Sequence, residues 1–384
     1  MTIHHGIKNT EIADAPRPLV EASSAVIGLI AIGDETTDTD TFPLDTATLI
    51  TDVRTAIGKA GTDGTLVKSL SAIADHCSPV IIVVRVAEGE DDAGTQANLI
   101  GTTTVDGKLT GMKALLSAFS NLGFRPNILG IPGYDNQAVT AALITIAQKL
   151  DASIYARADG DTLAAAIAYK AHFTDRAVDL IWPEWTGWGG EAVARALGLR
   201  ALLDQTIGWH QSLSNQPVLG VTGISQDVYF DLSGVGTDAA ALNSAPITTL
   251  IRKPGGGFCY WGNRTCSEDQ DFAFEVAVRT GQVIRQTIRD AEAPFLDQPM
   301  TPALVKTIID TVQRQFDSWV TQGRLMGGRI WYDGDLNTSI DLSAGKLALS
   351  YDYTPVAPLE SLTNNEHITD KYYLNFGDQI AALG

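Results

Sequence analysis

The sequence predicts an α/β protein: a mostly parallel sheet with helices on both faces, followed by a smaller α+β domain. Apolar runs rich in β-branched residues alternate with amphipathic segments over residues 23–253, as in chains built from strand–helix repeats. Two long helical patterns and two strand-like patterns then follow over residues 254–366. With 384 residues, 45% of them apolar, the chain can bury two cores. Residues 1–22 and 367–384 are predicted to be extended arms.

The first domain carries the clearest strand signals. Residues 25–32 and 79–86 are continuous apolar runs, typical of strands that are buried on both faces. Residues 97–110 are compatible with either a hairpin or a longer excursion. The remaining elements are expected as helices over 66–74, 112–122, 137–150, 163–173 and 192–203, and strands over 128–131, 154–158 and 178–182.

The stretch 252–267, RKPGGGFCYWGNRTCS, marks the change between the two patterns. Three glycines after Pro254 predict a turn, and the aromatic run 258–261 predicts a short strand. Ser267 and Gln270 have the spacing of a capping box, so we expect a long helix to begin there.

The second domain is expected to have an incomplete sheet. Thr301 and Pro302 predict the start of a helix that runs to residue 322. The patterns over 328–333 and 347–353 predict only two strands, which would leave exposed edges. Both arms carry spaced apolar residues that could line a strand. We therefore expect the sheet to be completed by strands exchanged between subunits, through Ile3, Ile7, Ile12, Tyr372, Leu374 and Phe376.

Charge is distributed unevenly along the chain. The net charge is −18, which argues against a nucleic-acid partner or insertion into an anionic membrane. Residues 252–331 hold 10 Lys and Arg against 9 Asp and Glu, so this part alone is not acidic. The polar side of the helix over 301–322 is then either a solvated face or a docking face for an acidic partner. Candidates for the docking face are Arg285, Arg289, Lys306 and Arg314.

An enzyme is the alternative class, because α/β sheets carry many activities. Gly234, Gly236 and Ala239 form a G-x-G-x-x-A pattern after an apolar run, and Arg252 with Lys253 could hold the phosphate of NADP. An NADP-dependent oxidoreductase is therefore the alternative function. No G-x-S-x-G elbow is present, and three dispersed cysteines suggest no zinc site. We expect no catalytic residue, no cofactor and no metal.

The N-terminus is polar and no apolar run is long enough to span a bilayer, so we expect synthesis in the cytosol and no membrane insertion.

Several motifs, in order along nearly the whole chain, resemble those of contractile-tail sheath proteins of phages and R-type bacteriocins. They include WGNRT at residues 261–265, formed by Trp261, Gly262, Asn263, Arg264 and Thr265. Others are HHG at 4–6, AGxxGTLxxSLxAIAD at 60–75, GWHxSLSN at 208–215, GVTGIS at 220–225, TTLIR at 248–252, AGKLxxxYDYTPVxPLExL at 344–362 and ITDKY at 368–372.

The resemblance implies a structural subunit that polymerises as stacked hexameric rings around an inner tube. Contraction of the rings would drive the tube through the envelope of a target cell. It implies that residues 23–253 form an outer domain, that residues 254–366 face the tube, and that the arms link neighbours. The implied partners are other copies of the chain, the inner tail tube protein, and baseplate and tail terminator proteins. The implied location is a virion tail or a bacteriocin particle, assembled in the bacterial host cytoplasm.

Overall fold

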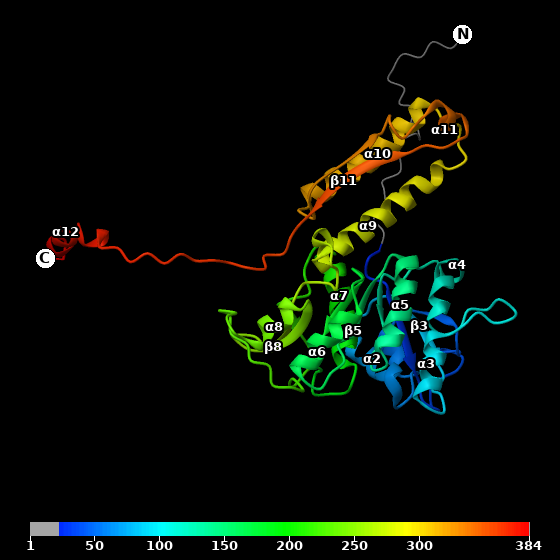
Figure 1. Cartoon of the computed structure of the whole chain (residues 1–384), viewed down its shortest axis with the longest axis horizontal. Coiled ribbons are helices and arrows are strands. Elements are labelled where there is room, and N and C mark those ends of the chain that lie inside the picture. Colours follow the sequence, from blue (N-terminus) through cyan, green and yellow to red (C-terminus); the bar gives the residue numbers. More distant parts are fainter. Residues whose placement is uncertain (1–22, 384) are drawn as a thin grey trace, which may run out of the picture.

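The computed structural model describes residues 23–383 and shows an α/β unit beneath a smaller helix-and-hairpin unit (Figure 1). The α/β unit is built on a nine-stranded sheet with the order β2-β3-β1-β4-β5-β6-β8-β9-β7. From β3 to β8 in this order the strands pair in parallel, whereas β2, β9 and β7 pair antiparallel at the two sides. The strands are β1 (Ile27–Ile32), β2 (Ala47–Ile50), β3 (Ile81–Val86), β4 (Ile128–Gly130), β5 (Ser153–Arg157), β6 (Val178–Ile181), β7 (Pro217–Val218), β8 (Ile247–Arg252) and β9 (Phe258–Trp261).

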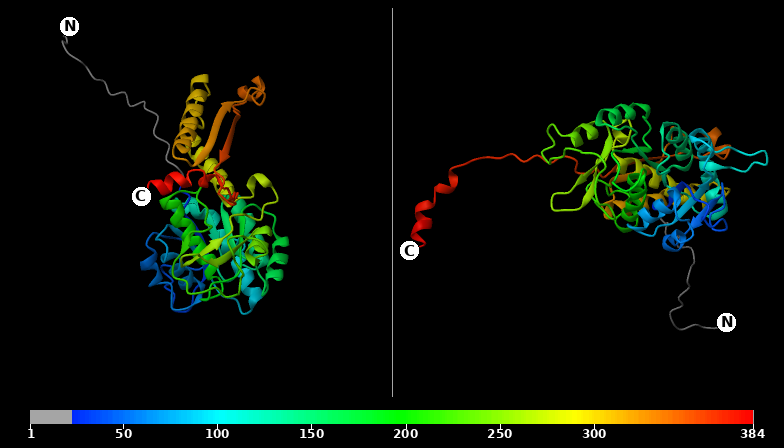
Figure 2. Two further views of the ribbon diagram at one scale, coloured as in Figure 1. Left: turned by 90° about the vertical axis from the view of Figure 1, so that its left-hand side faces the viewer. Right: turned by 90° about the horizontal axis from the view of Figure 1, so that it is seen from below.

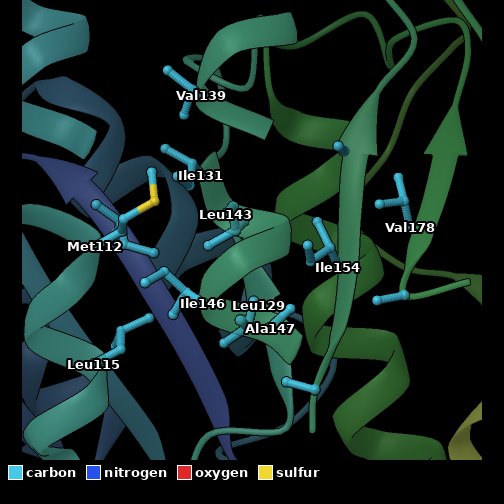
Figure 3. Close-up of a cluster of buried hydrophobic side chains, with 14 of the residues drawn as sticks. Met112, Leu115, Leu129, Ile131, Val139, Leu143, Ile146, Ala147, Ile154 and Val178 are labelled. Carbon is cyan, nitrogen blue, oxygen red and sulfur yellow. The ribbon is translucent and has the colours of Figure 1, made fainter. Parts of the chain in front are cut away.

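Helices cover both faces of this sheet, as predicted. One face packs against α1 (Val53–Ile57), α2 (Gly64–Ala74) and α7 (Glu191–Thr206). The other face packs against α3 (Asp92–Ile100), η1 (Gly111–Ser117), α4 (Ala118–Leu122), α5 (Gln137–Leu150), α6 (Leu163–Tyr169) and α8 (Asp238–Ser244). Figure 3 shows this second core, where Leu143 and Ile146 of α5 meet Met112 and Leu129. A fully buried strand such as β1 contributes to both cores, which explains its unbroken apolar run.

Residues 97–110, expected as either a hairpin or a longer excursion, have features of both. Residues up to Ile100 complete α3, and a loop then extends outward and returns through a bridge between Thr103 and Leu109. Val105, at the tip, is fully exposed, and the loop projects from the body of the unit (Figure 2).

The smaller unit consists of two long helices packed on one hairpin. The helices are α9 (Glu275–Glu292) and α10 (Pro302–Thr321), and the hairpin pairs β10 (Leu325–Tyr332) with β11 (Leu349–Pro355), joined through the short α11 (Ser339–Ser343). Phe316 and Trp319 of α10 pack with Ile284 of α9 and Ile330 of β10 in its core. As predicted, the Thr301 hydroxyl caps α10 by accepting the N–H of Leu304 at 3.2 Å.

Two expectations at the junction of the units are wrong. β9 hydrogen-bonds to β8 over four residue pairs, so the domain boundary expected after residue 253 would cut through the large sheet. The helix expected from Ser267 begins only at Glu275, with Phe274 as its N-cap residue. The Ser267 hydroxyl instead accepts the N–H of Asp269 inside a loop, so the capping-box spacing is coincidental here.

The C-terminal arm also differs from its prediction. The residues that alternate over 369–376 were expected to be strand-like, but they form the turn η5 (Lys371–Tyr373) and the start of α12 (Phe376–Ala381). Among residues 23–383 no strand lies beside them, and helical turns are the conformation that satisfies backbone groups locally. Figure 1 shows this arm far from the body of the chain. Ile3, Ile7 and Ile12 lie outside the described residues.

Candidate functional site: the joint between the two units

The WGNRT motif forms the connection between the large sheet and α9. Trp261 ends β9 and packs edge-to-face on Phe230, with ring centroids 5.1 Å apart. Gly262 has a φ of 148°, and a Cβ there would lie 2.8 Å from Cα of Thr248, so only glycine fits without a shift. The carbonyl of Asn263 accepts the N–H of Glu275, the first residue of α9, at 3.0 Å.

The two remaining motif residues hold the loop before α9. Thr265 is buried; its hydroxyl donates to the carbonyl of Phe272 at 3.1 Å, and its N–H donates to that of Ala273 at 2.9 Å. Arg264 lies over the ring of Phe274, 4.9 Å from the centroid. Its guanidinium group donates two hydrogen bonds to Glu360, at 2.7 and 2.6 Å. The motif therefore contacts the sheet, α9 and the segment that follows β11.

A buried ionic cluster fastens α9 to α7. Arg200 and Asp204 on α7 form an ion pair at 2.7 Å, and both side chains are completely buried. Arg279 of α9 pairs with the same Asp204. Glu275 of α9 pairs with Arg200 at 3.3 Å and accepts the hydroxyl of Tyr155 from β5. Two guanidinium groups thus face two carboxylates in a volume without solvent.

A third carboxyl group, that of Asp179, lies buried beside this cluster. Asp179 of β6 is buried, and burial together with the nearby Glu275 carboxylate raises its pKa well above the usual value. The raised pKa favours the protonated form of Asp179, and the two arginines are paired with Asp204 and Glu275. Because removing either sign would leave a buried charge without a partner, the cluster favours one arrangement of α7 and α9.

An aromatic contact and a cluster of ion pairs also connect the α/β unit with the smaller unit. Trp209, in the loop after α7, is completely buried in the core of the smaller unit, 5.5 Å from the ring of Trp319. Asp151, which follows α5, pairs with Arg285 at 2.5 Å and with Arg289 at 3.2 Å. Arg285 and Arg289 were expected to face a partner, but both are bound to the α/β unit of their own chain. The joint therefore includes contacts from α5, α7 and α9.

The other two candidate docking residues lie on the open side of α10. Lys306 has 77% of its side chain exposed and pairs with Asp310 at 3.2 Å, one turn along the helix. Arg314 is exposed and donates to the carbonyl of Asp310 at 3.0 Å. Their contacts stay within α10, and this face remains accessible.

Two open apolar grooves lie between the long helices and the β10–β11 hairpin with its connection. One groove, of about 770 Å³, is lined by residues that include Val305 and Ile309 of α10 and Tyr332 of β10. The second, of about 660 Å³, lies between the helices and β11, with Leu349 and Tyr351 in its lining. The arm residues Tyr372, Leu374 and Phe376 are 74%, 84% and 52% exposed. The chain thus presents apolar grooves and apolar arm residues that do not meet within one copy.

The G-x-G-x-x-A pattern of Gly234, Gly236 and Ala239 does not lie between a strand and a long helix, as a dinucleotide-binding turn would. The apolar residues before Gly234 form no strand, and the following α8 has seven residues capped by the Thr237 hydroxyl. A phosphate-binding turn requires a strand, a tight turn and a helix of useful length, so the NADP-dependent oxidoreductase finds no support here.

His76 and Cys77, just after α2, place an imidazole next to a thiol, a pairing that can form a nucleophile, but here both side chains are at least partly buried. Burial raises the pKa of the Cys77 thiol to about 12, and its Sγ contacts the carbonyl of Gly198 at 3.3 Å. A thiol with so high a pKa is not a nucleophile at neutral pH. Within residues 23–383 no helix is long and apolar enough to cross a membrane, and no cluster of three His, Cys, Asp or Glu side chains could bind a metal.

Sequence reasoning missed most of the joint. Arg200, Asp204, Glu275 and Arg279 are charged residues on helices, and such residues are nearly always exposed. The available signal was their spacing. Arg200 and Asp204 are four residues apart on α7, and Glu275 and Arg279 are four residues apart on α9. In both helices most of the other buried residues are apolar or small.

Comparisons with known proteins identify this architecture. The fold matches the helical sheath of the anti-feeding prophage in its contracted state, with a TM-score of 0.71 at 17% identity over 96% of this chain and 100% of that chain. It also matches the sheath complex of an extracellular contractile injection system, PVC, with a TM-score of 0.69 at 15% identity over 97% and 99% of the two chains. The fold class is that of contractile sheath subunits.

The sequence defines the family. Residues 107–266 match the phage tail sheath protein central domain, residues 267–369 the tail sheath C-terminal domain, and residues 25–86 the N-terminal region of domain III of the tail sheath protein Gp18. The chain is 44% identical to the tail sheath protein of Escherichia phage P2, over 97% of each chain. It is 45% identical to the major tail sheath protein of Serratia phage KSP20, over 96% of each. The chain belongs to the phage tail sheath protein family and is a structural subunit of a contractile tail sheath.

Proposed function

We propose that copies of this chain assemble as stacked hexameric rings around an inner tail tube, and that shortening of the rings drives the tube through a target cell envelope. The observation that supports the proposal is that the β10–β11 hairpin pairs with no other strand of residues 23–383, while two apolar grooves lie between it and the helices. Each free edge of the hairpin can accept one additional strand, and the sequence predicts an arm at each end of the chain. Exchange of arms between neighbours would fill both grooves and join every subunit to others.

The helical turns of the C-terminal arm do not oppose this exchange. η5 has three residues and α12 has six, and helices this short are marginal in water. Their apolar side chains are exposed in the single chain. A neighbour's strand edge offers ladder hydrogen bonds and cross-strand pairs of about 0.2–1 kcal/mol each, which would favour an extended arm.

The buried ion pairs between α7 and α9 would keep the two units of each subunit in one orientation during assembly. A subunit that transmits force between rings needs a fixed relation between its two units, and the buried cluster around Asp204 supplies it. We propose that residues 23–261 form the outer part of the sheath and that the smaller unit faces the tube through the open side of α10. Baseplate and tail terminator proteins would bind the end rings, and the particle would be a phage tail or a related headless device.

The test is deletion of the C-terminal arm, residues 368–384. We expect a soluble monomer with unchanged cooperative unfolding that forms neither rings nor tubes, because every side chain in the deleted segment that the structure describes is exposed. The double variant Tyr372→Asp, Leu374→Asp should behave in the same way. Its matched control, Tyr372→Phe with Leu374→Ile, keeps the apolar character and should assemble normally. Sedimentation and negative-stain microscopy decide the result, and tubes formed by the truncated chain would exclude arm exchange.

A further inference from the structure

We propose that Arg264 and Glu360 form a clasp that fixes the point and direction at which the C-terminal arm leaves the subunit. Glu360 lies in the segment 356–368, which links β11 to the arm. Its carboxylate accepts two hydrogen bonds from one guanidinium group, at 2.7 Å from Nε and 2.6 Å from Nη2. Among residues 23–383 these two are the only side-chain hydrogen bonds between that segment and the rest of the chain.

The arginine side of the clasp is rigidly placed. Arg264 lies between Gly262, which fits closely against β8, and Thr265, which is hydrogen-bonded to the loop before α9. Its backbone forms a bridge with Phe274, and its guanidinium group covers the ring of that residue. Arg264 is therefore held by contacts with β8, with the loop before α9 and with Phe274.

The glutamate side is otherwise free to move. Residues 359–369 are all exposed, including Leu359 at 80% and Leu362 at 72%. In Figure 1 the segment passes beside the junction of the two units before it runs outward. A small space lined by Asn243, Pro246 and Arg264 lies beneath Glu360, so the linker meets the α/β unit at this place. Without the two hydrogen bonds, the mobile tether would begin at the end of β11.

The length of the tether determines how strongly the arm is concentrated near its acceptor. With the clasp closed, Glu360 and Thr369 are nine positions apart; with it open, Pro355 and Thr369 are fourteen positions apart. Because effective concentration falls roughly as the −3/2 power of tether length, opening the clasp lowers it about twofold. Loss of a defined starting direction lowers it further.

Bidentate geometry explains why an arginine serves here. The planar guanidinium group presents two parallel donors that match a carboxylate, whereas a lysine ammonium would leave the linker free to swing about a single contact. The clasp is therefore a device that orients the linker, in which Arg264 is a positioning residue for the arm.

This inference rests on the proposed exchange of arms, and its experiment separates the two. The variant Glu360→Ala should fold with an unchanged thermal transition, since its side chain is 39% exposed, yet its critical concentration for polymerisation should rise at least about twofold. Glu366→Ala, an exposed residue of the same linker without a contact in the described chain, is the matched control and should polymerise normally. Light scattering against subunit concentration gives both values.

The charge-exchanged variant Arg264→Glu, Glu360→Arg tests whether the ion pair itself matters, because it restores the pair with the two charges exchanged. It should lower the critical concentration toward the original value, relative to Glu360→Ala. The clasp is excluded if Glu360→Ala polymerises like the unaltered chain while the arm-deleted chain does not. If the arm-deleted chain itself polymerises, arm exchange fails and the clasp fails with it.

Discussion

His76 shows how a buried side chain near the joint can set the response of the subunit to pH. It lies just after α2 and close to Gly198 of α7, and neither ring nitrogen has a hydrogen-bond partner among the described residues. Burial, together with the positive charge of Arg195, lowers the pKa of His76 to about 4. The folded chain therefore holds this residue neutral, and protonation favours the unfolded chain.

We predict a loss of stability as the pH falls through the interval between 6.5 and 4. In that interval the unfolded chain binds the proton and the folded chain does not, so the free energy of unfolding falls by about 2 kcal/mol between pH 7 and pH 5. Denaturant titrations of the dilute subunit measure this difference. The variant His76→Gln, which does not titrate there, should lose less stability over the same interval. An equal loss in both proteins would show that other groups cause it.

At the scale of elements, helices α7 and α9 contact each other through buried ion pairs, whereas most helix pairs contact each other through apolar side chains. Asp204 contacts Arg200 on its own helix and Arg279 on the other. A buried ion pair contributes little net stability compared with a well-packed apolar pair, but it does not tolerate the loss of one partner. The cluster therefore selects one register of α9 against the sheet.

Replacing Asp204 by alanine should destabilise the subunit by about 3–5 kcal/mol, because two buried guanidinium groups would lose their shared carboxylate. The matched control is Asp310→Ala, which removes a carboxylate from an exposed pair on α10 and should change stability by less than about 1 kcal/mol. Chemical denaturation of both variants measures the difference. Similar small losses for the two would mean that the cluster does not brace the joint.

At the scale of the whole molecule, the acidic chain has one unit with a different charge balance. Residues 252–331 carry 10 basic and 9 acidic side chains, although Arg285 and Arg289 are bound to Asp151. Lys306 and Arg314 remain on the open side of α10. In the proposed rings, repeated contacts of this face with a tube would add up even though single surface pairs contribute little.

We expect the double reversal Lys306→Glu, Arg314→Glu to hinder assembly on the inner tube while the thermal transition of the subunit stays the same. Attraction between exposed charges is screened by salt, so assembly of the unaltered sheath on the tube should weaken with ionic strength. The control Arg54→Glu, Lys108→Glu makes the same change in net charge on exposed residues of the α/β unit and should assemble normally. Co-sedimentation with the tube measures each; normal binding by the first variant would exclude this face.

The local sequence was sufficient for features that arise within a few residues. The continuous apolar run of β1, the Thr301 cap of α10 and the outward placement of Lys306 all follow from patterns shorter than one element. The family, too, could be identified from short motifs that occur in order along the chain, and at Gly262 of WGNRT the packing shows why no other residue fits.

Only the tertiary structure decided which distant residues meet. Asp204 and Arg279 are 75 positions apart, Asp151 and Arg285 are 134 apart, and Arg264 and Glu360 are 96 apart. A helical pattern tells which residues share a face but does not name the partner across it, so charged residues that prove to be buried look like ordinary exposed ones. The C-terminal arm is the converse case: its two-residue period suits a strand, yet within one chain it lies beside no strand of residues 23–383 and forms helical turns. A strand needs a second strand for its backbone hydrogen bonds, and only the folded structure determines whether a second strand lies close enough.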